Sequence, residues 1–274
     1  MRVNVINFAL ERLNKNLINR GNVFSPIEVE AKTDQFLSAN LLSLLPSDFK
    51  TIFAEVHNKE GKSFVRVVYS ELKKSMGLSG LAPKEIVFKE LSDGINAEYD
   101  DLYNVIYYSP KALKENSKAK QVGTIAHELT HCKQSCDLIM NNAIGVDGYA
   151  QALAERKISK QRQDISDIKF QKAYMAAKKQ GKNGQFIMNL VNIKKEYFTP
   201  LLKQSFANVD RLPKVKADSK SAFYLRNNLL SLSCYSKSRV YDFSLVEHFR
   251  EKQAYEVGSK YENYYKICEN LLKK

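Results

Sequence analysis

Two histidines and a glutamate stand at a spacing that can hold a metal ion and support hydrolysis. They form the stretch His127-Glu128-Leu129-Thr130-His131. On a helix, residues four apart point the same way, so both imidazoles can reach one metal ion. Glu128 is rotated by about 100° from His127, which places its carboxylate beside the metal rather than on it. The pattern therefore predicts metal-assisted hydrolysis.

The expected metal is zinc, and the expected reaction is cleavage of an amide bond. Zinc lowers the pKa of water and polarises a carbonyl group. The Glu128 carboxylate accepts a proton from the attacking water and returns it to the departing amine. This chemistry needs both histidines and the glutamate, whereas Leu129 and Thr130 are free to vary. With only four histidines in the chain, composition alone seldom produces the pattern.

The elements around this pattern suit the chemistry. A helix is expected from about Ala119 to Leu138, because its apolar residues recur with the helical period. Two strands are expected upstream, at Glu85–Lys89 and Asn104–Tyr108, with turn residues at Asp100 and Asp101 between them. The periodic apolar positions of the helix are Val122, Ile125, Ala126, Leu129 and Cys132.

The stretch Thr124–His131, preceded by the strand Asn104–Tyr108, resembles the zincin superfamily of metallopeptidases. In that fold a small mixed sheet lies against the active-site helix, and an edge strand shortly before the helix pairs with extended peptide substrate. The resemblance covers residues 83–137 and one later segment. It implies an α+β fold, a bound zinc ion and a peptide or protein substrate.

The third zinc ligand must come from elsewhere, because no glycine and histidine follow His131 at the metzincin spacing. Glu251 is preferred, since Glu251–Gly258 resembles the Glu-x-x-Ala-Tyr helix that supplies this ligand in small bacterial zincin-like proteins. A small residue at Ala254 would let that helix approach the histidine helix closely. Glu155, 24 residues after His131, is the alternative, at a spacing close to that of thermolysin-like enzymes.

Hydrolysis also needs a donor for the negative charge that develops on the substrate oxygen. Tyr255 and His248 are the catalytic candidates, because both fall on the Glu251 side of the expected helix, and Tyr241 is also available. His248 could instead be a ligand or a partner of one. The C-terminal helices are expected at Ser244–Ser259 and Tyr261–Leu272.

The rest of the chain is expected to be mainly helical. Residues 1–80 form a helical N-terminal region, and residues 81–274 form the catalytic domain with a basic helical insertion at about 156–220. Within the insertion, Gly181–Gly184 and Phe198-Thr199-Pro200 are expected to interrupt the helices. Met1–Arg20 is interpreted as a structural first helix rather than a transit peptide.

The formal net charge is +13, with the excess concentrated between Arg156 and Lys220. Such a surplus can bind nucleic acid or an anionic surface. Between Arg156 and Lys182, acidic residues interrupt the basic run, and its aromatics are few (Phe170 and Tyr174), so a solvated helical face is favoured. No apolar stretch is long enough to cross a bilayer.

The four cysteines, Cys132, Cys136, Cys234 and Cys268, form no metal-binding or redox motif. Cys132 and Cys136 are expected to be buried thiols rather than a bridge. Together with the lack of a secretory signal, this predicts a cytoplasmic protein.

The sequence thus predicts a zinc metallopeptidase with His127, His131 and Glu251 as ligands and Glu128 as general base. Two other interpretations stay open. One is a basic protein that binds nucleic acid or a membrane surface and keeps a structural zinc. The other is a zincin-like protein that binds peptide without cutting it.

Overall fold

The computed structural model describes residues 49–83, 85–164, 166–234 and 249–272. They are mostly helical and include one small mixed sheet, which confirms the predicted α+β class. The predicted helix at the N-terminus, Tyr241 and His248 lie outside the described residues. The described residues fall into two compact units. We call residues 49–83, 85–133 and 251–272 the histidine unit, and residues 134–164, 166–234 and 249–250 the helical unit.

The sheet of the histidine unit has three strands: β1 (Val87–Phe88), β2 (Ala97–Asp100) and β3 (Val105–Tyr108). β3 is the middle strand, parallel to β1 and antiparallel to β2. Two strands were predicted; β2 was not predicted, and its last residue, Asp100, was assigned to a turn. The Asp100 carboxylate does end that strand, because it accepts hydrogen bonds from the backbone N–H groups of Leu102 and Tyr103.

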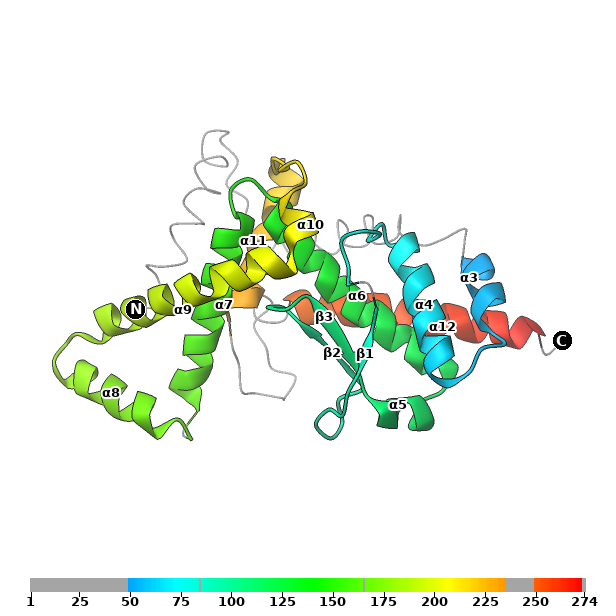
Figure 1. Cartoon of the computed structure of the whole chain (residues 1–274), viewed down its shortest axis with the longest axis horizontal. Coiled ribbons are helices and arrows are strands. Elements are labelled where there is room, and N and C mark those ends of the chain that lie inside the picture. Colours follow the sequence, from blue (N-terminus) through cyan, green and yellow to red (C-terminus); the bar gives the residue numbers. More distant parts are fainter. Residues whose placement is uncertain (1–48, 84, 165, 235–248, 273–274) are drawn as a thin grey trace, which may run out of the picture. The chain divides into compact units, whose positions relative to one another are not determined.

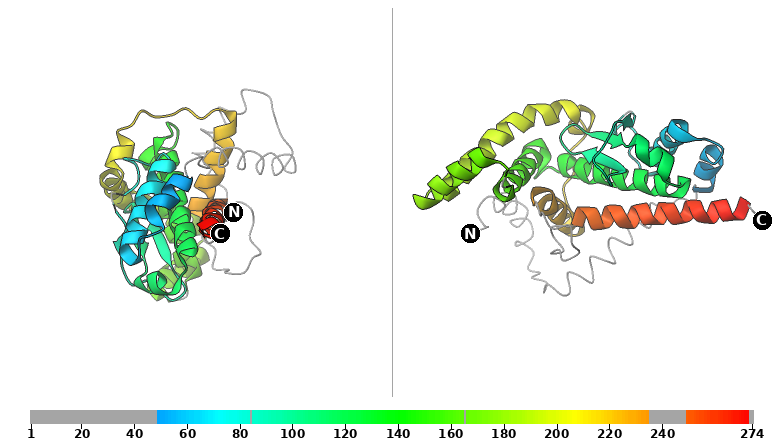
Figure 2. Two further views of the ribbon diagram at one scale, coloured as in Figure 1. Left: turned by 90° about the vertical axis from the view of Figure 1, so that its right-hand side faces the viewer. Right: turned by 90° about the horizontal axis from the view of Figure 1, so that it is seen from below.

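The sheet lies against α6 (Lys118–Met140), the long helix predicted from the apolar spacing (Figures 1 and 2). Tyr99 and Ile106 are paired in register and both are buried, so one face of the sheet is covered. Asn104, which has a φ of 50°, receives hydrogen bonds from the Tyr99 hydroxyl and from the Cys132 thiol. The turn between β2 and β3 is thereby tied to α6. All five predicted apolar positions of α6 are buried.

The histidine unit is completed by α3 (Phe49–Val56), α4 (Gly61–Ser75), α5 (Pro110–Glu115) and most of α12 (Phe249–Leu272). The Tyr265 ring of α12 contacts the rings of Phe53 and Phe64. The predicted break at Lys260 was wrong, because α12 continues through it as one helix. Its residues Val257, Tyr261 and Tyr265 are buried at helical spacing, and burial of that stripe favours an unbroken helix.

α6 and α12 come into backbone contact at two glycines. A Cβ atom at Gly123 would lie 2.8 Å from the Gly258 carbonyl oxygen, and one at Gly258 would lie 3.3 Å from the His127 Cβ atom. No larger residue fits this approach without moving a helix. The close approach that was predicted to depend on Ala254, which is buried, therefore also depends on Gly258.

The helical unit contains α7 (Gly145–Gln163), α8 (Ile168–Lys179), α9 (Asn183–Ser205), α10 (Ala207–Asp210) and α11 (Ser219–Ser233). Ala154, Ile158, Phe170 and Val191 form a core that joins α7, α8 and α9. The predicted break near Gly181 is confirmed. The predicted break at Pro200 was wrong, because α9 runs through it to bury Leu202.

The described cysteines are all unbridged, and Cys132 and Cys136 are buried as predicted. Within the described ranges, no helix combines the length and the hydropathy needed to cross a bilayer.

Replacing Gly123 by alanine should destabilise the protein by about 1–3 kcal/mol, although alanine favours a helix. The new methyl group would push α12 away from α6. Gly184→Ala is the matched control, because a Cβ atom there meets nothing within 4 Å. Urea unfolding of both variants measures the difference, and equal stabilities would contradict the close packing.

Candidate metal and catalytic site

The side chains of His127 and His131 converge on one side of α6. Their Nε2 atoms are 3.1 Å apart, and the two rings meet nearly edge to face. The side chain of His127 is 16% exposed and that of His131 is 11% exposed. Two ring nitrogens this close need a proton or a cation between them, because two lone pairs repel each other.

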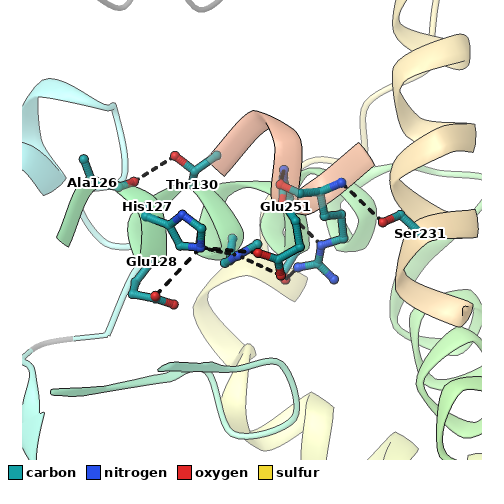
Figure 3. Close-up of polar contacts among 10 residues, drawn as sticks. Ala126, His127, Glu128, Thr130, Ser231 and Glu251 are labelled. Atoms are coloured by element: carbon teal, nitrogen blue, oxygen red, sulfur yellow. Dashed lines mark hydrogen bonds and ion pairs between the residues drawn. The ribbon is translucent and has the colours of Figure 1, made fainter. Parts of the chain in front are cut away.

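Glu251 of α12 reaches the same point (Figure 3). One of its carboxylate oxygens lies 3.5 Å from His127 Nε2, and the other lies 3.4 Å from His131 Nε2. Burial raises the pKa of this carboxyl group, but hydrogen bonds and positive charge from both histidines outweigh burial and hold the pKa well below its usual range. Glu251 therefore stays ionised and contributes the negative charge that a cation site needs.

The spacing of these three groups fits a zinc ion. Tetrahedral zinc with ligand atoms at about 2.0–2.1 Å holds those atoms about 3.4 Å apart. The two Nε2 atoms are 3.1 Å apart, and the two Glu251 oxygens lie 3.5 Å from His127 Nε2 and 3.4 Å from His131 Nε2, so the carboxylate faces the ion position with both oxygens. Imidazole and carboxylate groups are also the ligand types that zinc accepts. Glu128 is a second carboxylate near the imidazoles: in the described part of the chain, His127, Glu128 and His131 each place one ligand atom within 4.8 Å of the others. Glu251 lies nearer to His127 Nε2 than Glu128 does, at 3.5 Å against 4.0 Å, and is therefore the preferred third ligand.

Glu128 is buried beside His127, on the side of the sheet. Its Oε1 atom lies 4.0 Å from His127 Nε2, and it accepts a hydrogen bond from the backbone N–H of Tyr99 in β2. Burial, together with the charges of Glu251 and Glu98, raises its pKa to about 7, although His127 and the Tyr99 N–H act in the opposite direction. A carboxyl group with this pKa can both accept and release a proton near neutral pH.

A clasp between α6 and α12 lies next to the predicted ligands. Gln134, three residues after His131, donates from Nε2 to the Arg250 carbonyl (3.1 Å) and accepts from Arg250 Nε (3.1 Å). Arg250 also donates to the Ser135 hydroxyl, and its backbone N–H bonds the Ser231 hydroxyl (Figure 3). The residue before Glu251 is therefore held in register with α6.

Sequence reasoning missed Gln134 and Arg250. Only a weak indication of this contact is present in the sequence. Arg250 is a charged residue directly before the Glu251 segment, and Gln134 is a polar residue within the buried part of α6. Gly123 and Gly258 carried a clearer signal, because a lone glycine inside a helical pattern often marks a close contact.

The structure places Tyr255 one turn after Glu251 on α12. Its ring meets the His127 ring at a tilt of 70°, with centroids 4.7 Å apart, and 65% of the residue is exposed. The tyrosine can therefore meet a molecule that approaches from solvent. Glu155, the alternative ligand, lies on α7 of the helical unit, where it accepts a hydrogen bond from Gln151 and burial raises its pKa.

Comparison of the chain with protein-family models, with curated proteins and with solved structures gave no match. Any function must therefore be inferred from the residues of this chain and their geometry.

The metal-free protein should become less stable relative to its Glu128→Gln variant as the pH rises. Because the carboxyl pKa is about 7 in the folded chain and 4.5 ordinarily, the folded state binds this proton more tightly. That contribution is complete below pH 4.5 and is lost as the pH passes 7. The difference in unfolding free energy should change by about 3 kcal/mol. Urea unfolding at a series of pH values, with a chelator present, measures it; a pH-independent difference would contradict the raised pKa.

Proposed function

We propose that the chain is a zinc-dependent metallopeptidase with a zincin-like fold. The observation that carries the proposal is the position of Glu251, which lies 120 residues after His131 and yet meets both histidines. The mixed sheet against α6, and the hydrogen bond from β2 to Glu128, support the zincin-like arrangement.

His127, His131 and Glu251 would hold the zinc ion. When bound, the ion would polarise the substrate carbonyl group and lower the pKa of the attacking water. A structural zinc site usually has four protein ligands, whereas a catalytic site has three and keeps one position open. The proposed site has three protein ligands, and Glu251 is half exposed. Both features favour the catalytic type.

Glu128 would be the general base. Its carboxylate takes a proton from the attacking water and gives it to the leaving amine, so the same group acts twice in one turnover. Burial raises the pKa of Glu128 to about 7 in the metal-free chain, and a zinc ion beside it would favour the ionised form that accepts the proton. The Tyr99 N–H orients the carboxylate, because the backbone of β2 fixes the position of that donor.

Tyr255 would stabilise the negative charge that develops on the substrate carbonyl oxygen. Its exposed ring lies beside His127, so its hydroxyl can turn towards a bound peptide. A zincin-like protein that only binds peptide would not need a buried carboxyl group beside the imidazole of His127. Glu128 therefore favours catalysis over binding alone.

Glu128→Gln should lower kcat for a peptide substrate by about 10²–10⁴-fold and leave the zinc content unchanged. Glutamine keeps the shape of the side chain but cannot accept the proton. Glu115→Gln on the exposed end of α5 is the matched control and should retain full activity. A Glu128→Gln enzyme as active as this control would exclude the general-base role.

Glu251→Ala should lose zinc on dialysis, because it leaves two protein ligands in place of three. Glu155→Ala should retain it, since Glu155 bonds Gln151 on α7. Metal content measured by atomic emission, with thermal unfolding to verify the fold, separates the two variants. Zinc kept by Glu251→Ala and lost by Glu155→Ala would reverse the choice of third ligand.

A further inference from the structure

The basic segment of the helical unit has an unusual exposed surface. Residues 156–182 contain nine lysines and arginines and two acidic residues, Asp164 and Asp167. Both acidic groups are engaged in the turn before α8: Asp164 accepts from the Ser166 N–H and hydroxyl, and Asp167 accepts from the Phe170 N–H and the Gln161 amide. Both carboxylates therefore accept hydrogen bonds within or next to the turn, and the positive charge of the lysines and arginines predominates on this surface.

The exposed stripe of α8 mixes lysines with aliphatic side chains. The stripe consists of Ile168, Lys172, Met175 and Lys179, and their spacings of four, three and four residues place them on one side of the helix. Ile168 is 61% and Met175 49% exposed, and in the part of the chain that the structure describes no carboxylate forms an ion pair with Lys172 or Lys179. We call this stripe the α8 outer face.

The opposite side of α8 is already occupied. Phe170 is buried in the core formed with α7 and α9, and Tyr174 packs against the same core. α8 runs from the end of α7 to the start of α9 and is held by both (Figure 1). The α8 outer face is therefore presented on a supported helix.

We propose that the α8 outer face docks on an anionic phospholipid surface. Lysine ammonium groups pair with lipid phosphates, while Ile168 and Met175 enter the boundary between headgroups and acyl chains. The alternation of exposed aliphatic side chains with lysines distinguishes this face from a purely polar one and matches the two layers of a lipid surface, phosphates outside and acyl chains beneath.

Nucleic acid fits this face less well than lipid. Binding to single strands depends on aromatic side chains that stack on bases, and the aromatics of the segment, Phe170 and Tyr174, are directed into the core. Binding to a duplex gains little from aliphatic side chains, because phosphates and sugars line the contact.

Vesicle co-sedimentation of the zinc-loaded full chain tests the proposal. The protein should bind vesicles of phosphatidylcholine with about 30% phosphatidylglycerol at low salt and bind pure phosphatidylcholine vesicles weakly. Lys172→Gln with Lys179→Gln should weaken binding at least about tenfold, and Ile168→Ser with Met175→Ser should also weaken it.

The matched control is Lys111→Gln with Lys114→Gln, which removes two exposed lysines from α5 and should leave vesicle binding unchanged. Three results would overturn the proposal: equal binding to neutral and anionic vesicles, equal losses in the α5 and α8 lysine variants, or no loss in the Ile168→Ser, Met175→Ser variant. Displacement of bound vesicles by a short DNA duplex at equal phosphate concentration would assign the face to nucleic acid instead.

Discussion

The candidate site depends on the close contact between α6 and α12. The backbones of the two helices are in contact at Gly123 and Gly258. Gln134 of α6 also forms two hydrogen bonds with Arg250 of α12. Glu251 lies between these two contacts along α12, just as His127 and His131 lie between them along α6. Because the proposed cation site would tolerate little displacement of its ligands, the glycine contact and the clasp are expected to set its geometry together.

Two carboxyl groups in this small region have opposite protonation behaviour. Glu251 faces two imidazoles, which hold its pKa low, whereas Glu128 is enclosed by the sheet and helix, and burial raises its pKa to about 7. Separated pKa values would suit the metal-ligand and general-base roles proposed for Glu251 and Glu128, respectively. The separation arises from position alone, since both are glutamates on neighbouring helices.

The histidine helix could be predicted because its information is local: a spacing of four residues and an apolar stripe from Val122 to Cys132 decide the face of each side chain. β2 could not, because Ala97-Glu98-Tyr99-Asp100 has few strand-forming residues and becomes a strand through pairing with β3. Glu251 was predicted by resemblance alone. Neither spacing nor composition relates a residue to a partner 120 positions away, and the Gln134–Arg250 clasp escaped prediction for the same reason.

That separation has a consequence for synthesis of the protein. A nascent chain exposes the two histidines and Glu128 long before α12 leaves the ribosome. Until then it lacks the carboxylate of Glu251, the glycine contact and the aromatic packing of Tyr265 on α3 and α4. The cluster can close only after α12 has been synthesised, because Glu251 lies 120 residues after His131. The fold thus delays the assembly of the cluster of His127, His131 and Glu251 until α12 is available.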